Sequence, residues 1–150
     1  MPMQATEIFH MIREYTIKDS GYHPFLISDG WQLAQLNYTE EQAIDKITHL
    51  DVHRETDEVF VSISGQAILI VAALQNDEPK FEIELMKLNK IYNIPKDVWH
   101  NIAMKPGSEV LIAEKSNTHI ADFEHLSLSK EKIEELNRMV NHLFNSNIGK

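Results

Sequence analysis

The residue types that could bind a metal gather in two short stretches of the sequence. The first runs from Asp51 to Glu58 and includes His53, and the second ends at His100, five residues after Pro95. Imidazole nitrogens and carboxylate oxygens form a ligand set that suits Zn, Fe, Mn, Ni or Cu and does not choose between them. We therefore predict a divalent-metal site at His53, Glu58 and His100, with Asp51 as a further candidate ligand.

These side chains can meet only if β-strands position them. Asp51 and His53 are two residues apart, so in a strand they lie on the same face. Glu58 opens the next stretch of strand pattern, and residues beside a tight turn lie close across an antiparallel pair. His100 must then come from a third strand, positioned by the turn at Pro95.

The pattern along the chain is typical of a mainly β protein. Phe81 to Leu85 alternates apolar residues with glutamates, which indicates a half-buried strand. Residues 67–74 are almost all apolar, which favours a strand covered on both faces. Further strands are expected at 31–38, 47–53, 57–64, 91–94, 99–104 and 109–114. Many short strands separated by Gly, Pro, Asn and Asp predict an antiparallel jelly roll or β-barrel, with a bend at Gly65.

Two helices are expected outside the barrel. Residues 6–16 have apolar residues at helical spacing and predict a short N-terminal helix, with an edge strand as the alternative. Ser129 can cap a helix from Lys130 to about Phe144, which would pack on the outside of the barrel or across a dimer. We expect one domain over residues 1–150, with the barrel core at about 31–114 and the C-terminal helix at about 129–144.

The spacing of the candidate ligands resembles the two motifs of the cupin superfamily. His53, four residues, Glu58, six residues and Gly65 match the end of the first motif, and Pro95 and His100 match the second. The resemblance covers roughly residues 47–114. It implies a small β-barrel with a metal in its mouth, and a homodimer.

The sequence departs from these motifs at three positions. Asp51 stands where the family has its first histidine, Asp97 where it has a glycine, and Met104 where it has an asparagine. The resemblance carries the ligand role to His53, Glu58 and His100. Asp51 would be a fourth ligand or an acceptor that orients His53. The alternative is a cupin barrel that has lost its metal.

Other polar residues have less specific patterns. His49 shares a strand face with Asp51 and is expected at the rim or surface rather than in the pocket. Glu55 falls in the turn and is expected to be solvated. Glu114 ends the last strand on an apolar face, as either an acid in the pocket or an exposed strand end. The remaining histidines show no ligand spacing: His10, His23, His119, His125 and His142.

Composition excludes several classes of function. The formal net charge of -9 argues against nucleic-acid and anionic-membrane surfaces. The chain has no cysteine, which rules out disulfides and thiolate ligands. The sequence shows no secretory signal, so we expect a cytoplasmic protein. It also has no nucleophile elbow, phosphate loop or dinucleotide fingerprint.

Three functional hypotheses remain. The first is a metal-binding cupin that acts on or binds a small polar metabolite such as a sugar or keto acid, as an isomerase or oxygenase if it is an enzyme. The second is a non-catalytic sensor or carrier of a small ligand or metal. The third is a metal-free barrel used in assembly. The expected partners are a small-molecule ligand and a second copy of the chain.

Overall fold

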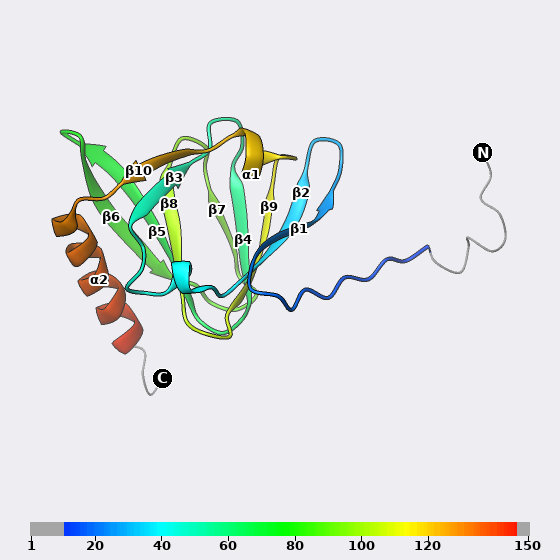
Figure 1. Ribbon diagram of the computed structural model, residues 1–150, viewed down its shortest axis with the longest axis horizontal. Helices are drawn as coiled ribbons and strands as arrows, with labels where there is room; N and C mark the ends of the chain where they lie inside the picture. The colour runs from blue at the N-terminus through cyan, green and yellow to red at the C-terminus, as the bar shows by residue number, and fades with distance from the viewer. Residues whose placement is uncertain (1–10, 147–150) are drawn as a thin grey trace.

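Two five-stranded antiparallel sheets make up most of the molecule (Figure 1). The structure is a computed structural model and describes residues 11–146. The first sheet has the order β1 (Gly21–Ile27), β2 (Gln32–Asn37), β9 (Glu109–Glu114), β4 (Glu58–Ser64) and β7 (Ile91–Ile94). The second has the order β10 (Glu124–Ser127), β3 (His49–Val52), β8 (Trp99–Met104), β5 (Ala67–Gln75) and β6 (Glu78–Leu85). The prediction of a mainly β, antiparallel fold is confirmed, although these strands do not close into one continuous barrel.

The inner core lies between the two sheets. It is built from residues of both, including Phe60 of β4, Leu69 of β5 and Ile112 of β9. All three are almost fully buried. Burial of side chains of this size stabilises the fold by about 1.5–3 kcal/mol each. Phe60 and Ile112 also line the pocket of the candidate site.

A second core covers the outer face of the β10–β6 sheet. There α2 (Lys130–Asn145) packs its apolar face on the sheet, near β6 (Figure 1). Leu136, Val140 and Phe144 are the fully buried residues of that face. Because α2 covers Ile68 and Ile70 from outside, β5 is apolar on both faces, as the sequence predicted. The predicted C-terminal helix is confirmed, and the Ser129 hydroxyl caps it by accepting from Lys132 N at 3.2 Å.

Two turns hold the strands at the site in place. Gly65, after β4, has φ +73°, and a Cβ there would lie 2.6 Å from Ser108 Cα, so only glycine fits. Asp97, which stands where cupins have glycine, has φ +69°. Aspartate tolerates this left-handed region better than most residues. Its backbone N–H donates to His53 O at 2.8 Å, which ties the turn before β8 to the end of β3.

The prediction of an N-terminal helix is wrong for residues 11–16. Residues 11–16 are neither helix nor strand, and residues 6–10 lie outside the described residues. Tyr15 packs on Phe25, with ring centroids 5.1 Å apart, and Gln35 Nε2 donates to Ile17 O at 3.2 Å. Tyr15 and Ile17 thus contact β1 and β2 instead of forming a helix.

Two strands lie outside the range 31–114 expected for the barrel core. β1 runs through Pro24, with a shift in register between His23 and Leu26. Proline is tolerated at such irregularities on edge strands. β10 follows the short helix α1 (Thr118–Ala121) and pairs with β3. A single helical turn, η2 (Glu40–Gln42), follows Thr39.

Candidate metal centre

Three of the four residues singled out as metal ligands lie together. Glu58 is the first residue of β4, His100 lies on β8, and His53 follows β3 directly. Glu58 Oε2 is 3.0 Å from His53 Nε2 and 2.7 Å from His100 Nε2. One ligand atom from each residue lies within 4.8 Å of the others. We name His53, Glu58 and His100 the buried cluster.

Backbone carbonyls orient both imidazoles of the buried cluster. His53 Nδ1 lies 2.6 Å from Asp122 O, and His100 Nδ1 lies 2.9 Å from Val98 O. A carbonyl oxygen only accepts, so each Nδ1 carries a proton, and each Nε2 points at Glu58. A histidine held in this way is prepared to bind a cation through Nε2.

The buried cluster shifts the pKa of its members. Burial lowers the pKa of His53, but hydrogen bonding to Glu58 and its charge outweigh burial and raise the pKa to about 9. The same balance raises the pKa of His100. Burial raises the pKa of Glu58, but hydrogen bonds and charge from His100 and His53 outweigh it and lower the pKa to about 2. Without a metal, each imidazole lies within hydrogen-bond distance of the Glu58 carboxylate.

The Asp122 carboxylate fastens the loop that carries His53. Its Oδ1 accepts from Arg54 N and its Oδ2 from Glu55 N, both at 2.9 Å. Asp122 therefore holds the His53 imidazole through its backbone carbonyl, and the backbone after His53 through its carboxylate. The sequence did not single out Asp122, because it comes from α1's end, 69 residues after His53.

Glu114 is a second buried carboxylate beside the cluster. Its Oε1 accepts from the Tyr22 hydroxyl at 2.5 Å and from Gln32 Nε2 at 3.0 Å. Its Oε2 is buried, has no hydrogen-bond partner among the described residues, and lies 3.9 Å from His53 Nε2. Burial, and then the charge of Glu58, raise the pKa of Glu114. Of the two alternatives for Glu114, the structure shows the buried one.

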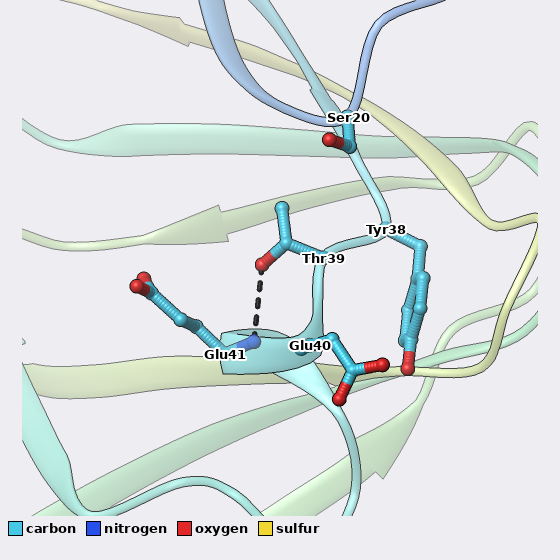
Figure 2. Close-up of a pocket in the computed structure, with 5 residues that line it drawn as sticks. All are labelled: Ser20, Tyr38, Thr39, Glu40 and Glu41. Atoms are coloured by element: carbon cyan, nitrogen blue, oxygen red, sulfur yellow. Dashed lines mark hydrogen bonds between the residues drawn. The ribbon is translucent and has the colours of Figure 1, made fainter.

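The cluster opens into a pocket of about 520 Å³. Its polar wall includes Glu114, Tyr22 and Asn101, and its apolar wall includes Phe60 and Ile112. A volume of this size accommodates a small molecule. Another hollow, of about 500 Å³, lies beside η2 and is lined by Ser20, Tyr38, Thr39, Glu40 and Glu41 (Figure 2). That lining contains no imidazole, so we do not treat it as the candidate site.

Asp51 lies apart from the buried cluster, although it lines the same pocket. It pairs in register with His125 of β10, and its Oδ1 is hydrogen-bonded to His125 Nδ1. His49 Nε2 lies 3.6 Å from the same oxygen. The sequence suggested that Asp51 joins His53, but the strand β10, which was not predicted, supplies Asp51 with another partner. We name His49, Asp51 and His125 the rim cluster.

Other sequence-based assignments have mixed outcomes. His49 was expected at the rim or surface rather than in the pocket, and it is a half-exposed residue that lines the pocket. Glu55 is exposed, as expected. His125 and His119, for which no ligand spacing was found, both line the pocket. Long-range pairing of β10 with β3 brings His125 there, whereas His119 lies on α1. The sequence of β10 carries little strand signal, because Leu126 is the one apolar residue at 124–127.

The donor set of the buried cluster fits a divalent metal. Two oriented Nε2 atoms and a carboxylate oxygen form an N₂O set, and Glu114 Oε2, which has no partner among the described residues, is a second oxygen nearby. Such a set is typical of zinc and of other first-row divalent metals.

Comparison with known sequences yields little. No family model matches the sequence. A part of human sorting nexin-25 is 29% identical over 128 residues, which is 78% of this chain but only 15% of that protein. The chain thus spans about 15% of the length of the curated relative that it matches.

Solved structures resemble this fold more extensively. Pac13, a Streptomyces nucleoside dehydratase, matches 81% of this chain and 97% of its own, with a TM-score of 0.54 and 11% identity. BH2720 of Bacillus halodurans matches 84% and 96%, with a TM-score of 0.54 and 13% identity. Hydroquinone 1,2-dioxygenase of Sphingomonas sp. TTNP3 matches 67% and 68%, with a TM-score of 0.50 and 8% identity. With its two facing antiparallel sheets and a His–Glu–His cluster between their strands, the chain has the cupin fold.

Proposed function

We propose that this chain is a metal-binding cupin whose buried cluster holds a divalent metal and whose pocket binds a small polar molecule. The orientation of the two imidazoles carries the proposal. With each Nδ1 proton on a backbone carbonyl, His53 Nε2 and His100 Nε2 both face Glu58. If both rings are neutral, three acceptor atoms face one another, and a cation among them would satisfy all three.

The polar wall of the pocket supports a ligand with hydrogen-bond donors. Glu114 Oε2 is free to accept from a hydroxyl or N–H of such a ligand. When bound, the metal would polarise a carbonyl or hydroxyl beside it. Sugars and keto acids, the substrate classes suggested by the sequence, carry these groups. Proteins of this fold bind small molecules: uridine with Pac13, and 4-hydroxybenzoate with hydroquinone 1,2-dioxygenase.

A metal-free small-molecule binder is the second candidate function. It is favoured by the fact that Glu58 Oε2 lies within hydrogen-bond distance of both imidazoles. Protonated imidazoles would satisfy this carboxylate without a cation. The raised pKa of His53 and of His100 favours the protonated imidazoles of this metal-free state.

Metal analysis separates the two functions. Protein purified without a polyhistidine tag should contain, or bind on addition, a stoichiometric divalent metal at the buried cluster. His100→Ala should lose that metal while its circular dichroism spectrum keeps the signature of the fold. If His100→Ala retained this metal with unchanged affinity, His100 would not be a ligand and the proposal would fail.

Ligand binding and assembly need their own measurements. A thermal-shift screen of sugars, keto acids, nucleosides and aromatic acids should stabilise the protein with at least one class, because a ligand of the folded state raises Tm. Turnover of that ligand would then distinguish an isomerase or oxygenase from a carrier. The homodimer remains a prediction, which light scattering on a sizing column would test. Among the described residues, no helix is both long and apolar enough to cross a membrane.

A further inference from the structure

The rim cluster contains a second set of metal-ligand atoms that the buried cluster does not use. His49, Asp51 and His125 each offer one ligand atom, and these atoms lie within 4.8 Å of one another. His49 Nε2 and His125 Nδ1 both face the same carboxylate oxygen, Asp51 Oδ1. The set therefore has two imidazole nitrogens and one carboxylate oxygen, as in the buried cluster.

Strand register brings these three residues together. His49 and Asp51 are two residues apart on β3, so their side chains lie on one face of the sheet. His125 is the register partner of Asp51 on β10, and residues directly opposite in an antiparallel pair share a face. The convergence thus follows from the backbone and does not depend on a single side-chain rotamer.

Neighbouring groups restrain the two imidazoles. The His49 and His125 rings meet edge to face, with centroids 5.0 Å apart. The Phe123 ring, just before β10, has its centroid 5.2 Å from that of the His125 ring. The backbone at His49 is held by Asn101 Nδ2, which donates to His49 O at 2.8 Å. Contacts of this kind lower the entropy lost when a metal orders the side chains.

We propose that His49, Asp51 and His125 form a second divalent-metal site at the mouth of the pocket, with specificity for first-row transition metals such as Zn²⁺. The separation of 3.6 Å between His49 Nε2 and Asp51 Oδ1 is close to the spacing of about 3.3 Å between neighbouring ligands in a tetrahedral zinc site. Water would supply the remaining positions, because the three residues are half-exposed or exposed. A site with open positions can also receive an oxygen or nitrogen of a bound small molecule.

The two sites would lie side by side. Asp51 of the rim cluster is the register partner of His100 of the buried cluster, on the neighbouring strand β8. Both clusters line one pocket. Four carboxylates, those of Glu41, Asp51, Glu58 and Glu114, line that pocket and would offset the charge of two dications. The rim site does not need the buried site, because the two share no ligand.

Zinc stoichiometry of the full chain tests this proposal. Metal-free protein, without a tag, is titrated with Zn²⁺ alone by calorimetry and checked by equilibrium dialysis with elemental analysis. The wild type should bind two equivalents. His49→Ala and His125→Ala should each lose one equivalent and keep the other, whereas His100→Ala should keep the rim equivalent. His142→Ala, at an exposed position on α2, is the matched control and should bind two.

The outcomes separate this inference from the proposed function. Zinc binding by His49→Ala and His125→Ala with unchanged stoichiometry and affinity would overturn the rim site. A wild type with one equivalent that His100→Ala abolishes would also overturn the rim site, while supporting the buried one. A wild type with one equivalent that His125→Ala abolishes and His100→Ala retains would support the rim site and contradict the buried one. Co²⁺ substitution gives a second readout, since loss of an imidazole ligand changes the visible absorption bands.

Discussion

The buried cluster and the rim cluster have the same residue types, two histidines and one carboxylate, in opposite environments. The side chains of His53, Glu58 and His100 are 11%, 9% and 8% exposed. In the rim cluster, Asp51 is 29% exposed and His125 is 55% exposed. The same chemistry therefore occurs once in a nearly dry setting and once in contact with water.

The difference shows that burial and backbone support, more than residue type, prepare a site. Each imidazole of the buried cluster is oriented by a carbonyl, from Asp122 or from Val98. The rim cluster relies on strand register and on contacts between rings. An ion pair in contact with water contributes about 0–1 kcal/mol to the free energy of unfolding. A buried carboxylate that loses its hydrogen-bond partners lowers that free energy by more. The buried cluster should therefore affect folding stability, and the rim cluster should affect it little.

The largest expected effect contrasts Glu58→Gln with Asp51→Asn. Each change removes one charge and nearly preserves shape. Glu58→Gln should lower the free energy of unfolding of the metal-free protein by about 1–3 kcal/mol, because two buried imidazoles lose the negative charge of their partner. Asp51→Asn should lower it by less than about 1 kcal/mol, because its pairs are screened by water. Urea denaturation at neutral pH measures both, and equal losses would contradict the contrast.

The pH dependence of stability should reflect the buried cluster. The pKa of His53 rises from 6.5 to about 9 on folding, so its contribution is complete below pH 6.5 and is lost as the pH rises through about 9. The pKa of Glu58 falls from 4.5 to about 2, so its contribution is complete above pH 4.5 and is lost as the pH falls toward 2. Metal-free protein should thus be most stable between about pH 4.5 and 6.5.

Chemical denaturation across this range checks the pH profile. In Glu58→Gln the decline above pH 6.5 should be much weaker, because the group that raises the pKa of His53 is gone. A decline of the same size in the variant would assign it to groups elsewhere in the protein.

A smaller effect is expected at Asp122, whose carboxylate positions the loop that carries His53. Asp122→Ala should weaken zinc binding at the buried cluster by about tenfold, as is usual for residues that orient a ligand. The rim equivalent should not change. Glu124→Ala is the matched control, since Glu124 accepts only from the exposed Arg54 side chain in this loop. Calorimetry of both variants gives the comparison, and equal affinities in the two would remove Asp122 from a positioning role.

The smallest effect is expected at Asp97, in the turn that supports His53 through its backbone. Asp97→Gly should change the free energy of unfolding by less than about 1 kcal/mol. Glycine relieves the positive φ of 69° but adds entropy to the unfolded chain. Asp97→Val should destabilise by more than about 1 kcal/mol, because a β-branched residue is disfavoured there. Urea denaturation measures both, and a valine variant as stable as the glycine variant would contradict the role assigned to the turn.

Prediction from sequence worked where the determining interactions are local. His53 and Glu58 flank one turn, so their proximity follows from spacing. The helix after Ser129 follows from a cap and an apolar stripe. The alternation from Phe81 to Leu85 marked β6, although its apolar residues contact α2 rather than the inner core.

Prediction was less complete where partners are distant. Asp51 has the spacing of a ligand beside His53, but its neighbour is decided by β10, some 74 residues later in the chain. Residues 11–16 have helical spacing, yet contacts such as that of Tyr15 with Phe25 replace the helix. Glu114 could not be assigned from sequence, because its burial depends on Tyr22 and Gln32 of β1 and β2.

By itself the sequence determined the mainly β class, the C-terminal helix and the cupin spacing of His53, Glu58 and His100. These depend on the period of side chains along strands and helices and on short turns, which are local properties. Tertiary structure alone decided that Asp51 faces His49 and His125, that Asp122 supports His53, and that one buried Glu114 oxygen has no partner among residues 11–146. These depend on which strands pair across the sheets, and that choice is set by burying the whole core at once.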